Sequence, residues 1–197
     1  MGSGFLNQKD EEYASFKSIV DDSLKVVTSN MLSGITTITD YAFAGCQNLE
    51  SVTIPGTVNV IDQYAFYNCL KLANVVIPNG VTIIGNYAFG YCSFLDNIVL
   101  PNSLLNIMDY TFRDCTSLSN ITLPTNLTSI GSLSFYNCRS LTSITVEATT
   151  PPSLGNNAFY DTSSSLVIYV PAESVDTYKT ATNWSTYASR IQAIPSS

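Results

Sequence analysis

The sequence predicts a solenoid, a fold in which one short supersecondary unit is stacked on itself. Two observations lead to this prediction: a phenylalanine recurs every 23 residues, and a cysteine follows three residues behind each one. The five pairs are Phe43 with Cys46, Phe66 with Cys69, Phe89 with Cys92, Phe112 with Cys115, and Phe135 with Cys138. A strict period of roughly 20–50 residues indicates such an architecture, because each unit can bury its apolar face only against its neighbours.

Each repeat begins with a short extended arm and a turn. In one copy the arm is the β-branched run 81–84, which favours a strand. A polar residue then stands three positions before the phenylalanine. The six examples are Asp40, Gln63, Asn86, Asp109, Ser132 and Asn156. Because Asp, Asn and Ser accept hydrogen bonds from the free N–H groups of a first helical turn, we expect a turn or two of helix here, with Ala88, Phe89 and Cys92 facing inward.

A main strand completes each repeat. In the same copy it is the segment 95–100, with apolar residues at its first, fourth and sixth positions. Pro101 ends it, because proline cannot donate to a ladder. The same L-x-x-[VI]-x-[IL] pattern recurs in the other copies. Equivalent residues of stacked strands should lie about 4.8 Å apart and form apolar ladders through the core.

The combined pattern A-F-x-x-C-x-x-L-x-x-[VI]-x-[IL]-P resembles the BspA-like subclass of bacterial leucine-rich repeats, from about Ile35 to Pro171. This resemblance implies a leucine-rich-repeat solenoid: a right-handed coil of about six turns with helical caps. It also implies a short-stranded parallel β-sheet on one face, with short helical or 3-10 turns elsewhere. Proteins of this family are expected at the cell surface or secreted, where they mediate adhesion to host proteins, other cells or glycans.

The repeat pattern divides the chain into four parts. Residues 1–4 resemble a remnant of cloning. Residues 5–34 should form an N-terminal cap, either an amphipathic helix, because apolar residues follow helical spacing over 13–24, or a degenerate repeat, because 23–27 resembles a strand. The solenoid should cover 35–171. Residues 172–197 should form a C-terminal cap with helices over Glu173–Thr182 and Asn183–Ile191.

Composition excludes several classes of function. The net charge of −7 and the lack of a basic run argue against nucleic acid and anionic membrane surfaces. No apolar stretch of about 18 residues is present, which argues against membrane insertion. Without histidine, His-based triads and metal sites are excluded, and cysteines 23 residues apart do not match a zinc knuckle. Enzyme motifs and paired carboxylates are also missing, so the sequence predicts no catalytic activity, no cofactor and no metal.

Two ladders have competing interpretations. The cysteines could form disulfides between coils, since stacked Cα atoms lie within bonding distance, or stay as buried free thiols, which parallel side chains favour. Tyr41, Tyr64, Tyr87 and Tyr110 stand two residues before successive phenylalanines. They could bind sugars or a partner as an aromatic strip, or simply cover the outer edge of the core, which is the interpretation we favour.

The outward-facing residues of the main strands form the candidate ligand surface, which we call the ridge. Its candidate residues are Asn74, Val76, Asn97, Val99, Asn120, Thr122, Ser143 and Thr145. Solenoids commonly bind partners along such an extended sheet. The alternative is that these side chains satisfy one another across the strands, without a ligand. Phe94 lies among polar equivalents and is interpreted as an isolated apolar bump.

These observations predict a non-enzymatic binding or adhesion module whose partner is a protein or a glycan. Two alternatives remain: a phage or prophage tail-associated recognition module, since similar repeats occur there, and a structural spacer within a larger surface protein. Neighbouring genes and flanking domains would separate the three. We expect a monomer if both ends are capped, because an unpaired strand edge is a template for association.

Overall fold

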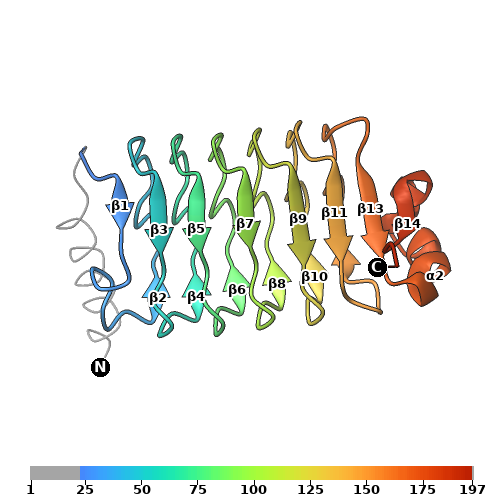
Figure 1. Cartoon of the computed structure of the whole chain (residues 1–197), viewed down its shortest axis with the longest axis horizontal. Helices are drawn as coiled ribbons and strands as arrows, with labels where there is room; N and C mark the ends of the chain where they lie inside the picture. The colour runs from blue at the N-terminus through green and yellow to red at the C-terminus, as the bar shows by residue number, and fades with distance from the viewer. Residues whose placement is uncertain (1–22, 197) are drawn as a thin grey trace, which may run out of the picture.

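The chain folds into an elongated stack of about seven turns, with its strands side by side along the long axis (Figure 1). The structure is a computed structural model and describes residues 23–196, except for the side chain of Asn97. The fold class predicted from the repeats is confirmed, with about one turn more than expected. The N-terminal helix expected over 13–24 lies almost wholly outside the described residues.

Main strands form one wall of the stack, which we call the main wall. They are β1 (Val26–Val27), β3 (Ser51–Thr53), β5 (Asn74–Val76), β7 (Asn97–Val99), β9 (Asn120–Leu123), β11 (Ser143–Val146) and β13 (Val167–Val170). Except between β7 and β9, neighbouring strands pair in parallel with equivalent residues aligned, for example Val52 with Val75. The early strand β1 pairs with β3, so the segment 23–27 continues this wall toward the N-terminus.

The arms form a second parallel sheet. Its six strands are β2 (Thr37–Ile38), β4 (Val60–Ile61), β6 (Ile83–Ile84), β8 (Asn106–Ile107), β10 (Ser129–Ile130) and β12 (Ser153–Leu154). They follow one another without interruption in the order β2 to β12. In each of these strands the second residue is buried, and it supplies an aliphatic side chain to the core.

The third wall, the corner wall, replaces the helical turns that the sequence predicted. It comprises residues 41–45 and their equivalents, up to 157–161. Here Tyr41, Tyr64, Tyr87, Tyr110 and Leu133 have φ between 53° and 60°, a left-handed conformation that a helix cannot contain. Within residues 23–171 no helix forms; hydrogen-bonded turns occupy these segments instead.

Backbone hydrogen bonds between coils explain why turns replace a helix. The N–H of Phe66 donates to the carbonyl of Ala88 at 2.8 Å, and the N–H of Phe89 donates to Thr111 at 2.9 Å. The expected capping residues serve the same stacking: Asn86 Oδ1 accepts the N–H of Asp109 at 3.0 Å. The polar side chains therefore join successive coils rather than cap a helix.

The core consists of ladders of identical residues. Successive phenylalanine rings of the repeats stack with centroids 5.2–5.6 Å apart. The five cysteines remain thiols, and none of them is in a disulfide. From Cys69 onward each Sγ donates to the carbonyl of the phenylalanine one coil earlier, as Cys92 does to Phe66 at 3.2 Å. Burial raises the pKa of the Cys92 thiol to about 12, so this ladder is neutral and structural.

The C-terminal cap closes the last coil. It contains η1 (Ala172–Ser174), α2 (Val175–Thr180), η2 (Trp184–Arg190) and a further parallel strand, β14 (Ile191–Ala193), which pairs with β13. Two buried aromatic residues anchor it: Tyr178 donates its hydroxyl to the Ala148 carbonyl at 2.7 Å, and Trp184 Nε1 donates to Pro152 at 2.8 Å. The expected second helix is thus a 3-10 helix that ends at Arg190, with Ile191 already in a strand.

Candidate binding surface

The ridge runs along the outer side of the main wall because a strand alternates its side chains between two faces. In β5, for example, Asn74 and Val76 are exposed, whereas Val75 between them is buried. The other ridge residues vary in exposure: Val99, Asn120 and Thr122 are exposed, and Ser143 and Thr145 are half-buried. Of Asn97, only the backbone position in β7 is described.

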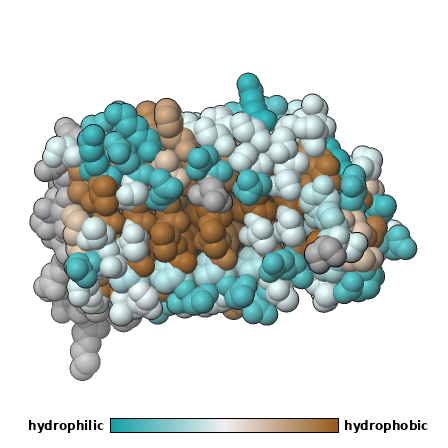
Figure 2. Space-filling view, viewed as in Figure 1, coloured by the Kyte–Doolittle hydropathy of each residue, from teal (hydrophilic) through white to brown (hydrophobic). Residues whose placement is uncertain are grey.

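Two exposed valines lie at the centre of the ridge. Val76 and Val99 are partners in the register of β5 and β7, and their exposed fractions are 58% and 71%. Figure 2 shows an apolar band over this part of the wall. The equivalent residues on the flanking strands are Thr53 and Thr122. The valines therefore form a local apolar centre between hydroxyl-bearing neighbours.

The main wall is interrupted beside these valines. The strands β1-β3-β5-β7 form one sheet and β9-β11-β13-β14 form another, and no register pair joins β7 to β9 in the part of the chain that the structure describes. We call this junction the seam. Across it, the N–H of Ser119 lies 3.5 Å from the Asp96 carbonyl, whereas the equivalent bond from Ala73 to Glu50 measures 3.0 Å. The seam is thus a place where the backbone ladder of the main wall weakens.

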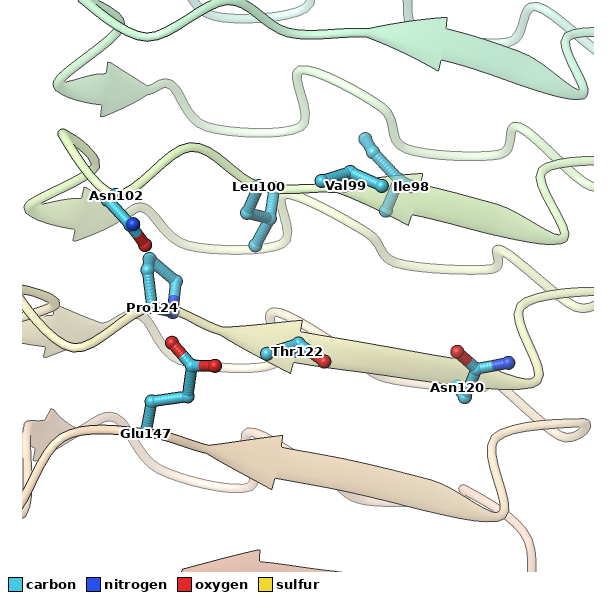
Figure 3. A pocket seen from close by; sticks show the side chains of 8 residues that line it. All are labelled: Ile98, Val99, Leu100, Asn102, Asn120, Thr122, Pro124 and Glu147. Atoms are coloured by element: carbon cyan, nitrogen blue, oxygen red, sulfur yellow. The ribbon is translucent and has the colours of Figure 1, made fainter.

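A shallow depression of about 240 Å³ lies at the seam (Figure 3). Its lining residues are Ile98, Val99, Leu100, Asn102, Asn120, Thr122, Pro124 and Glu147. Figure 3 shows Asn120 at one end, and Asn102 and Glu147 on either side of Pro124 at the other. This lining mixes apolar side chains with amides, a hydroxyl and one carboxylate, so the depression can contact an apolar side chain and hydrogen-bond the groups around it.

The structure brings only some of the predicted ridge residues to this depression. Val99, Asn120 and Thr122 line it. Asn74 and Val76 lie on β5, which pairs with the far side of β7. Ser143 and Thr145 lie on β11, where they pair with Asn120 and Thr122.

Sequence reasoning missed the residues that follow the strands, above all Glu147. A signal for it exists: the equivalent position is proline in four earlier repeats, at Pro55, Pro78, Pro101 and Pro124. Thr125 donates its hydroxyl to Glu147 Oε2 at 3.4 Å, which holds the carboxylate beside the depression. The replacement of this repeated proline by glutamate is therefore a sequence signal for a residue that lines the depression.

Among residues 23–196, no three His, Cys, Asp or Glu side chains gather as metal ligands would. No helix in that range is long and apolar enough to cross a membrane. The depression has a single carboxylate, whereas acid–base chemistry on a glycosidic bond uses two.

Comparisons with known proteins agree with the repeat pattern. The family model described as a BspA type leucine-rich repeat region matches six copies, over residues 17–109 and 82–183. Among curated proteins, no relative matches this chain.

Several solved structures are similar to the chain. A Treponema pallidum leucine-rich repeat protein is 29% identical, with a TM-score of 0.65 over 75% of this chain and 69% of that protein. A leucine-rich cell surface protein of Faecalibacterium prausnitzii is 27% identical, with a TM-score of 0.55 over 72% and 41%. The pneumococcal vaccine antigen PcpA shares the fold at 21% identity, with a TM-score of 0.56 over 80% and 42%. The chain thus spans less than half of the last two proteins.

Proposed function

Because the chain belongs to the BspA-type leucine-rich repeat family, we propose that it is a non-enzymatic binding module of a bacterial surface protein. Its ligand is another protein, bound by the ridge with Val76 and Val99 at the centre of contact. The observation that carries this proposal is the exposure of these two paired valines beside a depression on the main wall.

The composition of the ridge favours a protein ligand over a glycan. Exposed β-branched side chains gain free energy mainly by excluding water from another apolar surface. Around them, Asn74, Asn120 and Thr122 can hydrogen-bond at the edge of such a contact, which matches the apolar centre and polar rim of protein interfaces. A sugar offers hydroxyls at nearly every carbon, and the two valines cannot pair with these.

The surface location rests on a named relative. The similar Faecalibacterium prausnitzii protein is described as a cell surface protein. The Thr- and Asn-rich, weakly charged sequence of this chain suits an extended scaffold that displays a binding face outside the cell. We extend that location to this chain on these grounds, as part of the proposal.

A pair of substitutions taken from the repeat itself tests the role of the ridge. Val76→Thr/Val99→Thr places at both positions the residue that other strands carry, so the fold should be kept. Wild type and variant are compared for binding to immobilised purified extracellular-matrix proteins, plasma proteins and a glycan array. We expect one protein ligand whose affinity falls about tenfold or more in the variant, since a desolvated apolar centre carries most of an interface's energy.

The matched control is Val167→Thr, which makes the same change on the half-buried position of β13, far along the wall. It should leave the affinity unchanged. A ligand that binds wild type and double variant equally contradicts the assignment of the ridge. Binding to the glycan array alone would replace the protein by a sugar, and binding to nothing on either panel would favour the spacer.

A further inference from the structure

A second candidate surface lies on the corner wall, which the ridge does not include. Eight tyrosines gather there, and we call them the tyrosine strip: Tyr41, Tyr64, Tyr67, Tyr87, Tyr91, Tyr110, Tyr136 and Tyr160. None of them is fully buried, and Tyr41 and Tyr160 at the two ends are exposed by half or more. The strip spans six successive coils, so it is a surface rather than a single contact.

The rings of the strip are ordered by one another. Tyr64 stacks on Tyr41 at 4.7 Å and on Tyr87 at 5.0 Å, and Tyr87 stacks on Tyr110 at 4.5 Å. Tyr67 lies across this row, nearly perpendicular to Tyr64 and Tyr87. Both faces of Tyr64 and Tyr87 are therefore covered by other rings, and a sugar ring cannot stack on them.

One cation already lies on the strip and shows what it can hold. The guanidinium carbon of Arg113 is 4.8 Å from the ring centroid of Tyr136, 5.7 Å from Tyr110 and 5.8 Å from Tyr91. These distances are those of cation–π contacts. Asp114 accepts from Arg113 Nε at 2.9 Å, which fixes the group between three rings and a carboxylate. The strip thus has the chemistry that recognises arginine.

The charge around the strip is negative. Four aspartates lie within two residues of a strip tyrosine: Asp40, Asp62, Asp109 and Asp161. Arg113 and Arg139 each lie three residues after a strip tyrosine, and each is ion-paired with an aspartate, Asp114 and Asp161 respectively. An incoming cation meets aromatic rings together with carboxylates such as that of Asp109, whose Oδ1 accepts the neutral N–H of Ser132, and both attract it.

We propose that the tyrosine strip is a second binding surface, which takes an arginine-bearing segment of a partner protein. The partner's guanidinium groups lie beside the aspartates, against the strip rings other than the covered pair Tyr64 and Tyr87, in the manner of Arg113. Arginine suits this surface better than lysine because its planar group stacks on aromatic rings and pairs with carboxylates in a fixed geometry. This inference does not depend on the ridge.

The first test uses isothermal titration calorimetry with three synthetic peptides that alternate glycine with arginine, lysine or glutamate. Tyr91→Asn is the informative variant, because the equivalent positions Asn68 and Asn137 are asparagine with the same positive φ. We expect the arginine peptide to bind wild type more tightly than the lysine peptide, and the glutamate peptide not to bind. Tyr91→Asn should weaken the arginine peptide about 3- to 10-fold, since one cation–π contact is lost.

Charge controls separate the strip from general attraction to an acidic protein. Asp109→Asn copies Asn86 of the previous repeat and should weaken binding of the arginine peptide severalfold. Asp176→Asn removes the same charge from the exposed side of α2, in the C-terminal cap, and should have little effect. Equal losses in the two variants would overturn the proposal, because they would show non-specific electrostatics.

Arg113→Ala provides a readout that a structural role would not give. Removing this guanidinium vacates its place on Tyr91, Tyr110 and Tyr136 and leaves Asp114 without its ion-pair partner. The arginine peptide should then bind about threefold more tightly or better than to wild type. Weaker binding to Arg113→Ala, or equal binding of wild type and Tyr91→Asn, would overturn the proposal. The ridge variant Val76→Thr/Val99→Thr should bind the peptide as wild type does.

Discussion

The corner wall and the main wall are built from the same repeats, yet only one of them is continuous. On the corner wall, backbone bonds of 2.7–3.2 Å join every coil from Tyr41 to Tyr160, and the phenylalanine and cysteine ladders lie behind them. On the main wall the ladder is interrupted between β7 and β9. The strictly repeated residues of the corner wall therefore maintain the stacking of the coils. The main wall, whose outward residues vary between repeats, tolerates the loss of one backbone pairing, and a depression forms there.

The largest expected difference in stability between the walls is found by replacing two phenylalanines of the same coil. Phe89 is fully buried in the corner wall, and Phe94, five residues later, is 61% exposed before the main strand. Phe89→Ala should lower the free energy of unfolding by about 3–5 kcal/mol, because it leaves a ring-sized cavity. Phe94→Ala should change it by no more than about 0.5 kcal/mol.

Urea denaturation of both variants measures this difference. Similar losses in the free energy of unfolding of the two variants would mean that the two rings contribute equally to stability, which contradicts the difference between the walls. The expected result would also support the interpretation of Phe94 as an isolated exposed ring.

Alkaline pH should weaken the corner wall through its thiols. Burial raises the pKa of Cys92 to about 12, and burial likewise raises the pKa of Cys115. An unfolded thiol loses its proton above a pH of about 8.5, whereas the folded one keeps it, so rising pH favours the unfolded state. Each buried thiol should therefore cost about 1.4 kcal/mol of stability per pH unit between about 8.5 and 12.

Comparison with Cys92→Ala isolates this effect, because lysines and tyrosines titrate equally in both proteins. The free energy of unfolding of the variant should depend less steeply on pH above 8.5 by the contribution of one thiol. Equal slopes for wild type and variant would show that Cys92 ionises as easily folded as unfolded.

The repeat pattern predicted the inward residues well because burial acts on every coil alike. The ladders of Phe89, Cys92 and Ile98 needed only the period and the two-residue alternation of a strand. The conformation of the turns could not be predicted in the same way. Asp40 and Asn86 are good helix caps, but the inter-coil bonds and the positive φ of Tyr41 and Tyr87 depend on neighbours that exist only once the coils are stacked.

The candidate sites were predicted less completely than the fold. The ridge followed from alternation, and Val99, Asn120 and Thr122 do line the depression. The missing pair between β7 and β9 has no sequence signal that we recognise. Arg113 was overlooked because its position varies between repeats, from Gly90 to Tyr136, and only stacking brings it onto three rings.

Amide hydrogen exchange of the free protein tests the difference between the walls most directly. The backbone amides at the seam, between β7 and β9, lack a continuous hydrogen-bond ladder and should exchange fast. The amides between β5 and β7, and those between β9 and β11, lie within paired strands and should exchange more slowly. On the corner wall, the amides of Phe89 and Phe112 should be protected on the same coils. Uniform protection along the main wall, with no fast exchange at the seam, would contradict this account.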